Sequence, residues 1–492
     1  MPSKKPFYIT TTLPYVNSDP HIGFAMEIVR ADAIARYHNS LNEEVFFNTG
    51  TDEHGVKIFE EATLAGKTPQ EYVDIYSAKF SELIEALNLS ISSFVRTTDE
   101  KHIEAAKKFW KLCDETGDIY KKQYKVKYCN GCELEKTDSE LVDGKCPLHT
   151  NLEIEIREEE NYFFKYSKYQ DKLMSLYKEH PDFITPQFRF NETLKWTERG
   201  LEDFSISRLK SKMPWGIPVP GDETQVMYVW FDALVSYISA IGWPHDKDTF
   251  EKWWNQSGGV IQYCGKDNNR QQSSMWQAML ISAGLNPSKK IIINGFINGV
   301  DGRKMSKSLG NVINPYEVVE LFKPFTDFPE DVLRFFLLQL PSFEDTNIDI
   351  TSIKDIYSAY LANGIGNLTN RIMKLAETYK VTLSEEYKWS ETYKDDDLYK
   401  QYIQNLNAYD IKKAVEAITQ TTQKMDEYMQ TNEPFKVIKV DEARGKEMIY
   451  KLVRNLWEVA IMLEPIIPRT AEKIKETISV NKMPEKPLFA RL

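Results

Sequence analysis

The first part of the chain alternates short apolar runs with longer stretches of helical periodicity. Residues 7–12 and residues 45–48 are short segments rich in aromatic and β-branched residues, and each predicts a strand. Between them, from Gly23 to Tyr37, apolar residues recur at the spacing of one helix face. Strand, helix and strand at these distances predict a parallel, doubly wound sheet, which binds ligands at the carboxyl ends of its strands.

A different pattern begins at Ile119 and interrupts this sheet. Residues 119–165 are polar and β-like, and they contain three of the five cysteines. Strand candidates for the parallel sheet return at residues 225–232, 259–264 and 290–297. We therefore interpret residues 119–225 as an insertion within one α/β domain.

The last part of the chain is helical almost without interruption, from about residue 351 to residue 478. Segments 353–379 and 410–429 are long and amphipathic, which predicts an all-α bundle. The predicted organisation is a sheet domain in two halves at residues 1–118 and 226–325, the insertion at 119–225, a linking segment at 326–350 and the bundle at 351–492.

Composition agrees with a multi-domain globular protein. The chain has 492 residues, of which 42% are hydrophobic and 27% charged, and its net charge is −11. At roughly 150 residues per domain, this length predicts about three domains. The apolar fraction is sufficient for buried cores and excludes a disordered chain. The net negative charge argues against a protein that binds nucleic acid over its whole surface, but it is compatible with a local basic groove.

Neither a membrane nor an oxidising compartment is indicated. No apolar run approaches the roughly 20 residues that a membrane helix needs. The apolar stretch after the basic N-terminus is too short and polar for a secretory signal. Five cysteines are too few for a disulfide scaffold and suit a reducing compartment. We expect a cytoplasmic protein.

The most specific motif is a pair of cysteine and histidine knuckles. Cys129 and Cys132 form a C-x2-C pair, and Cys146 and His149 form a C-x2-H pair 13 residues later. Such knuckles bring three thiolates and an imidazole to one tetrahedral Zn²⁺, with no position left for catalysis. The alternative is two unrelated thiol pairs in a core. The other two cysteines, Cys113 and Cys264, are expected to be core residues.

Two further segments suit the binding of phosphates, although neither is decisive alone. His21, in His-Ile-Gly-Phe, precedes a predicted helix, so it could donate to a phosphate at the positive helix end or merely cap the helix. Lys304 and Lys307 lie in a short loop after the last predicted strand and can neutralise a triphosphate, whereas a solvated basic loop is the plain alternative. The P-loop spacing G-x4-G-K-[ST] is absent.

Together, the two segments resemble the signatures of the class I aminoacyl-tRNA synthetases, and within that class the methionyl-tRNA synthetase family. Supporting motifs span nearly the whole chain: Leu13-Pro14-Tyr15, residues 51–55, the two knuckles, residues 205–208, 215–218 and 228–233, Gly265-Lys266-Asp267, and Gly366-Asn367. The resemblance implies a Rossmann-like parallel sheet with a zinc-knuckle insertion, a stem-contact segment at 326–350 and a helical anticodon-binding domain. It also implies activation of methionine with Mg-ATP to methionyl-adenylate, followed by transfer to methionine tRNA.

The resemblance assigns roles to individual residues. Asp52 would bind the α-ammonium of methionine, which is a suitable partner for a carboxylate. The other methionine-binding candidates are Leu13, Tyr15, Trp230, Ala233, Tyr237, Asn268 and Gln272. The ATP-binding candidates are Gly23, Phe24, Glu27, Gly265, Asp267 and Lys307. The catalytic candidates are His21, Lys304 and Lys307, and the candidates for reading a CAU anticodon are Asn367, Arg371 and Phe435.

Several positions depart from the family pattern. Phe24 replaces the second histidine of the His-Ile-Gly-His signature and cannot bind phosphate. The other departures are Asn268 for an apolar residue, Gln272 for a histidine, Leu234 for a proline and Phe435 for a tryptophan. The chain ends at Leu492, soon after the bundle, so we expect a monomer without a C-terminal tRNA-binding module.

Two alternatives remain open at this point. Another class I synthetase, such as a cysteinyl or leucyl enzyme, is one, although the insertion looks too short for the editing domain of leucyl, isoleucyl and valyl enzymes. A catalytically silent RNA-binding paralogue is the other. It is suggested by Phe24 and Gln272 and opposed by Asp52, Lys304 and Lys307, which a mere binder does not need. Methionine-dependent ATP–pyrophosphate exchange distinguishes all three.

Overall fold

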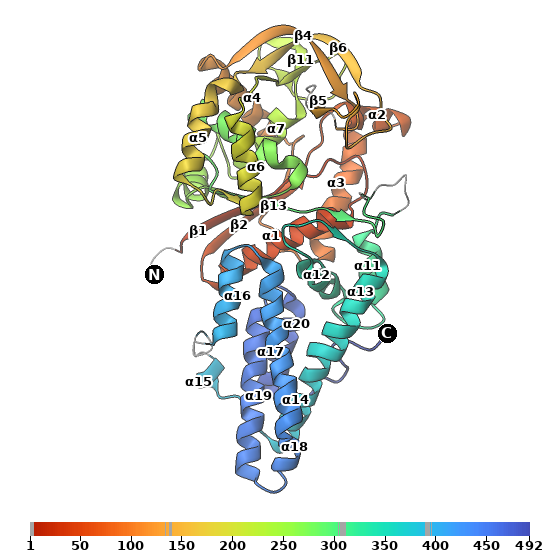
Figure 1. The fold of residues 1–492 in the computed structure, drawn as a ribbon, viewed down its shortest axis with the longest axis vertical. Coiled ribbons are helices and arrows are strands. Elements are labelled where there is room, and N and C mark those ends of the chain that lie inside the picture. Colours follow the sequence, from red (N-terminus) through yellow and green to blue (C-terminus); the bar gives the residue numbers. More distant parts are fainter. Residues whose placement is uncertain are drawn as a thin grey trace.

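The computed structural model describes residues 4–132, 134–136, 140–303, 305, 311–388, 394 and 396–492. The molecule is elongated, with an α/β half above and a helical bundle below (Figure 1). The strands of the insertion lie at the far end from the bundle, and helix α1 lies between the sheet and the bundle. Among the described residues, no helix is both long enough and apolar enough to cross a membrane.

The α/β half is built on a six-stranded sheet in which every described pairing is parallel. Its order is β3 (Ser93–Arg96), β2 (Glu44–Thr51), β1 (Pro6–Thr11), β12 (Val260–Gly265), β13 (Lys290–Asn294) and β7 (Ile184–Thr185). The chain moves outward from β1 to β2 and β3 on one side and from β12 to β13 on the other, so the two central strands form a topological switch point. In doubly wound sheets, ligands bind at this place, beyond the carboxyl ends of the strands.

Helices follow the strands as the alternating pattern predicts. Those of the α/β half are α1 (Ile22–Ser40), α2 (Val56–Leu64), α3 (Pro69–Ala86), α4 (Glu100–Glu115), α5 (Gln170–Glu179), α6 (Gln187–Glu198), α7 (Val229–Leu234), α8 (Ser236–Ser239), α9 (Lys247–Phe250), α10 (Trp276–Ser282), α11 (Pro315–Phe322) and α12 (Pro329–Gln339). Short turns of other helix types include η2 (Tyr166–Tyr169), η3 (Glu251–Gln256), η4 (Lys266–Asn268) and η5 (Gln271–Met275).

The insertion contains two small antiparallel sheets. One has the order β5 (Leu134–Lys136), β4 (Ile119–Cys129), β6 (Glu155–Phe164) and β8 (Phe204–Ser205). The other has the order β10 (Pro218–Val219), β11 (Asp222–Met227) and β9 (Ser207–Leu209). Between β6 and β8 the chain returns to the parallel sheet, because β7 pairs with β13.

One predicted strand of the parallel sheet is wrong. Residues 225–232 divide between β11, which ends at Met227 in an antiparallel sheet, and α7, which begins at Val229. A short apolar run does not distinguish a buried strand from a buried helix, since both bury the whole run. The side chains of Phe231 and Leu234 are buried in the same core as α4, and that packing selects the helix.

The C-terminal part is helical, as predicted. Its helices are α13 (Ile350–Ile356), α14 (Asn367–Tyr379), α15 (Glu385–Lys388), α16 (Asp397–Asn407), α17 (Ile411–Asn432), α18 (Pro434–Val437), α19 (Glu442–Leu463) and α20 (Pro468–Val480). The π-helical segment η7 (Tyr357–Gly366) joins α13 to α14, with a kink at Gly364. A two-stranded ladder, β14 (Ile297–Asn298) with β15 (Thr346–Asn347), precedes the bundle.

The sheet and the bundle share one continuous apolar core, which includes residues of α1, α12 and the long bundle helices. Arg334 of α12 is fully buried at this junction and pairs with Asp32 of α1 at 2.7 Å. The Arg334 guanidinium also donates to the carbonyls of Pro465 and Ile466, between α19 and α20. These contacts fix α1 relative to the bundle.

Candidate functional site

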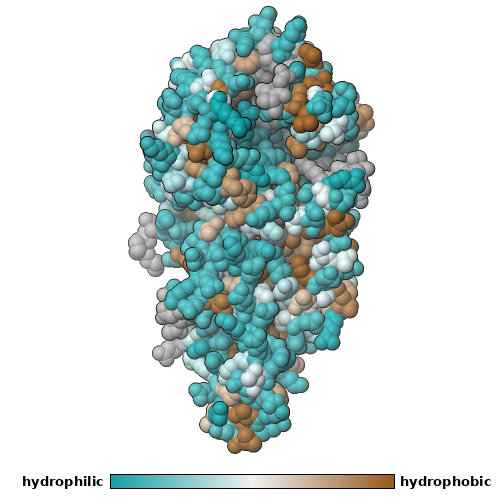
Figure 2. Space-filling view, viewed as in Figure 1, coloured by the Kyte–Doolittle hydropathy of each residue, from teal (hydrophilic) through white to brown (hydrophobic). Residues whose placement is uncertain are grey.

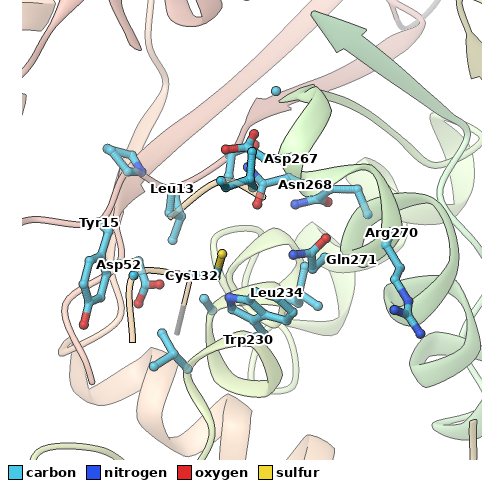
Figure 3. Close-up of a pocket in the computed structure, with 18 of the residues that line it drawn as sticks. Leu13, Tyr15, Asp52, Cys132, Trp230, Leu234, Asp267, Asn268, Arg270 and Gln271 are labelled. Carbon is cyan, nitrogen blue, oxygen red and sulfur yellow. The ribbon is translucent and has the colours of Figure 1, made fainter. Parts of the chain in front are cut away.

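A cleft of about 1350 Å³ opens at the carboxyl ends of β1 and β12. The predicted methionine and ATP residues in the described part of the chain all line it: Leu13, Tyr15, His21, Gly23, Phe24, Glu27, Asp52, Trp230, Ala233, Tyr237, Gly265, Asp267, Asn268 and Gln272. Figure 3 shows Tyr15 and Asp52 on one side of the cleft, facing Trp230, Asn268 and Gln271 on the other. Segments far apart in the sequence therefore meet at one site.

His21 lies at the N-terminus of α1 and caps it. Its Nδ1 accepts the backbone N–H of Gly23 at 3.0 Å, so the neutral imidazole carries its proton on Nε2. A Cβ on Gly23 would lie 2.9 Å from the His21 ring, so glycine preserves this geometry. A helix N-terminus attracts anions, and the site suits a phosphate.

Phe24 has a different kind of neighbour. Its ring packs edge-on against Phe80 of α3, with the ring centroids 5.2 Å apart and an interplanar angle of 75°. Phe24 therefore contributes apolar packing at the start of α1. The His-Ile-Gly-His signature has a histidine at this position, and Phe24 does not replace its hydrogen-bonding group.

Glu27 is a buried carboxyl at the base of the cleft. It accepts the backbone N–H of Thr12 at 2.9 Å. Burial raises the pKa of Glu27 to about 8, and the nearby Asp267 adds to the rise despite the Thr12 hydrogen bond. A carboxyl that stays protonated near neutral pH can donate a hydrogen bond as well as accept one.

Asp52 lines the cleft beside Tyr15 and is held by backbone contacts. Its N–H donates to the Pro14 carbonyl at 2.9 Å, and its carbonyl accepts the Val16 N–H at 3.2 Å. Tyr15 is thereby fixed beside Asp52 in a parallel bridge. Gly55 has a φ of +124°, and a Cβ there would lie 2.4 Å from the Tyr15 hydroxyl.

A buried acid and two histidines lie behind this pocket and received no role from the sequence. His54 Nδ1 lies 3.0 Å from Asp232, and His102 Nε2 lies 3.6 Å from the same carboxylate. Burial opposes the ionisation of Asp232, but the two imidazoles lower its pKa overall. His54 follows Asp52 by two residues and Asp232 belongs to α7, which carries Trp230, so the cluster ties the two pocket walls together.

Arg208 is a further residue to which the sequence analysis gave no role. The motif at residues 205–208 was the signal that could have pointed to it. Its guanidinium donates to Ser205 Oγ at 2.8 Å and to the Ser207 carbonyl at 2.7 Å. It also lies over the Tyr228 ring, 4.1 Å from the centroid. Arg208 therefore presents a fixed positive charge beside the cleft that it lines.

The four predicted metal ligands come together. The donor atoms of Cys129, Cys132, Cys146 and His149 all lie within 4.8 Å of one another. Cys132 Sγ is 3.4 Å from Cys146 Sγ and 3.2 Å from His149 Nδ1. A tetrahedral ion with metal–sulfur bonds of about 2.3 Å has edges of roughly 3.5–3.8 Å, so this group could hold one metal ion. A Cβ on Gly131 would lie 2.4 Å from the His149 ring, so the knuckle turn requires glycine.

Comparison with known families gives two matches that divide the chain. Residues 7–153 and 148–373 match the family described as class I tRNA synthetases (M), and residues 384–487 match the anticodon-binding domain of methionyl tRNA ligase. The methionine–tRNA ligase of Thermotoga maritima is 37% identical over 98% of this chain and 76% of its own length. The chain belongs to the methionyl-tRNA synthetase family.

Solved structures of methionyl-tRNA synthetases agree with this assignment. The Mycobacterium tuberculosis enzyme in complex with methionyl-adenylate has a TM-score of 0.88 and 32% identity, covering 99% of this chain and 98% of its own. The methionine–tRNA ligase of Rhizobium meliloti is a further relative, 38% identical over 98% of this chain and 93% of its own length.

In this member of the methionyl-tRNA synthetase family, the predicted anticodon residues lie on the bundle. Asn367 is exposed at the start of α14, and Arg371, one turn later, pairs with Asp426 of α17. Phe435 is 38% exposed on α18, at the end of the bundle far from the sheet (Figure 1). Figure 2 shows apolar side chains at that end, where Phe435 and Val440 are exposed.

Lys304 and Lys307 lie outside the described residues. Met305, between them, is described and packs against the large core. Gly299, before this loop, donates its N–H to the Arg303 carbonyl at 2.9 Å, which closes a tight turn at the mouth of the cleft, near Ile297.

Proposed function

We propose that this chain is a methionine–tRNA ligase that activates methionine with ATP and transfers it to methionine tRNA. The observation that carries the proposal is the cleft, which combines a carboxylate, apolar walls and a capped helix N-terminus at one switch point. A relative with the same fold along the whole chain binds methionyl-adenylate in its solved structure. That ligand unites the two substrates that the cleft chemistry suits.

In the proposed first step, Asp52 binds the α-ammonium of methionine, because a charge-assisted contact is strong in a buried position. Leu13, Tyr15, Trp230, Ala233 and Tyr237, with Asn268 and Gln272, enclose the side chain. Flat apolar walls suit a flexible thioether. The methionine carboxylate is thereby placed beside the phosphate site.

ATP occupies the remaining part of the cleft. Gly23, Phe24, Glu27, Gly265 and Asp267 contact adenosine, and His21, Lys304 and Lys307 contact the phosphates. Mg²⁺, bound with ATP, supplies further positive charge to the phosphates. The methionine carboxylate attacks the α-phosphorus, the bond to the β-phosphate oxygen breaks, and pyrophosphate leaves with the negative charge. No protein nucleophile is needed, since positioning and charge neutralisation lower the barrier.

In the second step, a ribose hydroxyl of the terminal tRNA adenosine attacks the adenylate carbonyl, and AMP leaves. We propose that residues 351–492 bind the CAU anticodon through Asn367, Arg371 and Phe435, and that residues 326–350 contact the acceptor stem. An unstacked base can lie on an aromatic face such as that of Phe435.

We further propose that Cys129, Cys132, Cys146 and His149 bind one structural Zn²⁺. Three thiolates and an imidazole are the donors that zinc prefers, and they fill a tetrahedron completely. The ion would hold the two knuckles of the insertion together at the edge of the cleft, which Cys132 and His149 line.

Methionine-dependent ATP–pyrophosphate exchange tests the first step, and charging of methionine tRNA tests the second. The proposal predicts both activities in the purified chain. Exchange that depends on another amino acid would indicate a different class I specificity. Tight tRNA binding without exchange would indicate a silent RNA-binding paralogue.

A further inference from the structure

A chain of buried polar side chains lies behind the proposed methionine pocket. Its members are Tyr237 of α8, Gln272 of η5, Gln262 of β12, Ser288 before β13 and Gln277 of α10. Each is at most 5% exposed. A buried amide destabilises a fold unless it is hydrogen-bonded, so three buried glutamines in one connected chain call for an explanation.

Gln277 is the member of this hydrogen-bonded series that is farthest from the pocket, and two backbone groups fix its amide. The Ser288 N–H donates to Gln277 Oε1 at 2.8 Å, and Gln277 Nε2 donates to the Gln272 carbonyl at 2.8 Å. A backbone N–H can only donate and a backbone carbonyl can only accept. The oxygen and the nitrogen of the Gln277 amide therefore have only one arrangement that satisfies both partners.

The donor-to-acceptor direction fixed at Gln277 is the same in each following hydrogen bond up to Tyr237. Gln277 Nε2 also donates to Ser288 Oγ at 3.1 Å, and the Ser288 hydroxyl donates to Gln262 Oε1 at 2.5 Å. Gln262 Nε2 then donates to Gln272 Oε1 at 2.6 Å, and Gln272 Nε2 donates to the Tyr237 hydroxyl at 2.7 Å. Each amide accepts on one side and must donate on the other, so the direction set at Gln277 determines the role of Tyr237.

The Tyr237 oxygen consequently acts as an acceptor toward Gln272. Burial raises the pKa of Tyr237 far above its ordinary value, so the hydroxyl keeps its proton. Both Tyr237 and Gln272 line the cleft. Because Gln272 Nε2 donates to the Tyr237 oxygen, the hydroxyl proton does not serve Gln272 and is available to an acceptor in the ligand space. A hydroxyl fixed as a donor favours a substrate with an acceptor atom at this place.

We propose that Gln277, Ser288, Gln262 and Gln272 form a polarised relay that holds the Tyr237 hydroxyl as a donor toward the substrate side chain. The relay selects a thioether sulfur, a weak acceptor, over an isosteric methylene. The four residues are positioning residues, because they act through Tyr237. The inference rests on the proposed function and concerns its selectivity.

The test is the ratio of kcat/KM for methionine to that for norleucine, in which a methylene replaces sulfur. In Gln277→Glu, an ionised carboxylate loses the donation to the Gln272 carbonyl and accepts from both the Ser288 N–H and the Ser288 hydroxyl. The Ser288 hydroxyl then accepts from Gln262, which reverses the Gln262 and Gln272 amides and turns the Tyr237 proton away from the cleft. We expect this ratio, measured by pyrophosphate exchange at pH 7 and pH 9, to fall about tenfold where the carboxyl is ionised. Ser288→Ala removes only the hydroxyl that connects Gln262 to Gln277. We therefore expect the same kcat/KM ratio to fall about twofold.

Matched controls separate selectivity from general damage. Gln225 is also buried, and its amide donates to the Glu160 carbonyl at 2.7 Å, outside the relay. Ser282 is a buried serine of α10 that donates to Asp118 at 2.8 Å. Gln225→Glu and Ser282→Ala should keep the wild-type ratio even if they lower stability, which thermal unfolding would report.

The inference is overturned if folded Gln277→Glu and Ser288→Ala both keep the wild-type ratio while the unmodified chain performs methionine-dependent exchange. An unmodified chain without that exchange would contradict the proposed function itself. The two failures are therefore distinguishable.

Discussion

His21 and Phe24 show how two residues of one signature can differ in chemistry. His21 caps α1 at the proposed phosphate site, whereas Phe24 packs on Phe80. A charged or donating contact made mainly in the transition state is worth about 10²–10³ in rate. We expect His21→Ala to lower the adenylation rate by that factor with little change in the methionine KM, measured by pre-steady-state adenylate formation.

Phe24→Ala is the matched comparison, and it should act mainly on stability and on the ATP KM, since a ring supplies packing without charge stabilisation. If Phe24→Ala lowered the adenylation rate as much as His21→Ala while ATP still bound normally, position 24 would support the transition state, and the assignment would be wrong.

Glu27 should make the stability of the ligand-free protein depend on pH. Its pKa is about 8 in the folded chain and near 4.5 when unfolded, so the folded state holds an extra proton between these values. The contribution of Glu27 is thus present at low pH and is lost as the pH rises toward 8. Glu27→Gln keeps the neutral form, and its free energy of unfolding relative to wild type should increase with pH by up to about 1.4 kcal/mol per unit. Urea unfolding at pH 5, 6, 7 and 8 measures this, and parallel curves would contradict it.

At the scale of elements, α14 and α17 are joined by the Arg371–Asp426 pair on the proposed anticodon face. Both side chains are about one-third exposed, so the pair contributes little stability. Arg371→Ala should raise the tRNA KM by a factor corresponding to about 1–3 kcal/mol and leave pyrophosphate exchange unchanged, because the base contact lies far from the cleft.

Asp426→Asn provides the complementary test, since it frees Arg371 from its acidic partner and should not raise the tRNA KM. A parallel loss of exchange and charging in Arg371→Ala would indicate a structural role for the residue.

The two knuckles of the insertion are elements that one metal ion would join. Purified protein should contain about one equivalent of zinc, because three thiols and an imidazole lie close together and make up the four donors that a structural zinc site needs. Cys146→Ser should lose the metal and destabilise the insertion, whereas Cys113→Ser, at a buried thiol outside the cluster, should keep it. Elemental analysis of both variants is the measurement, and metal-free wild-type protein with all four ligands reduced would refute the assignment.

At the scale of the whole molecule, Arg334 and Asp32 join the bundle to α1, whose first turn carries His21. Removing one partner of a buried ion pair costs about 3–5 kcal/mol when the other charge is left unpaired. Asp32 keeps Arg36 at 2.8 Å and two hydrogen bonds from Ser90, so Arg334→Met should lower the free energy of unfolding by less than this amount. The double variant Asp32→Asn with Arg334→Met should lose less than the sum of the two single losses. Strictly additive losses in denaturant unfolding would show that Asp32 and Arg334 are not energetically coupled.

Much of this architecture follows from local sequence. The strands at residues 7–12 and 45–48, the helices of the bundle and the metal ligand set depend on spacings of two to four residues, which local backbone geometry fixes. The strand predicted at residues 225–232 is wrong, because a short apolar run fits a strand or a helix equally well until its neighbours in the fold are known.

The sequence by itself determined the alternation of elements, the zinc-type knuckles and the motifs that mark the family. Only the tertiary structure brought His54 and His102 to Asp232, because those residues are remote in the chain and meet through packing. It also decided that the donor direction at Tyr237 is set by the Ser288 backbone. Hydrogen-bond direction depends on which groups face one another in the folded core, and no local spacing encodes that.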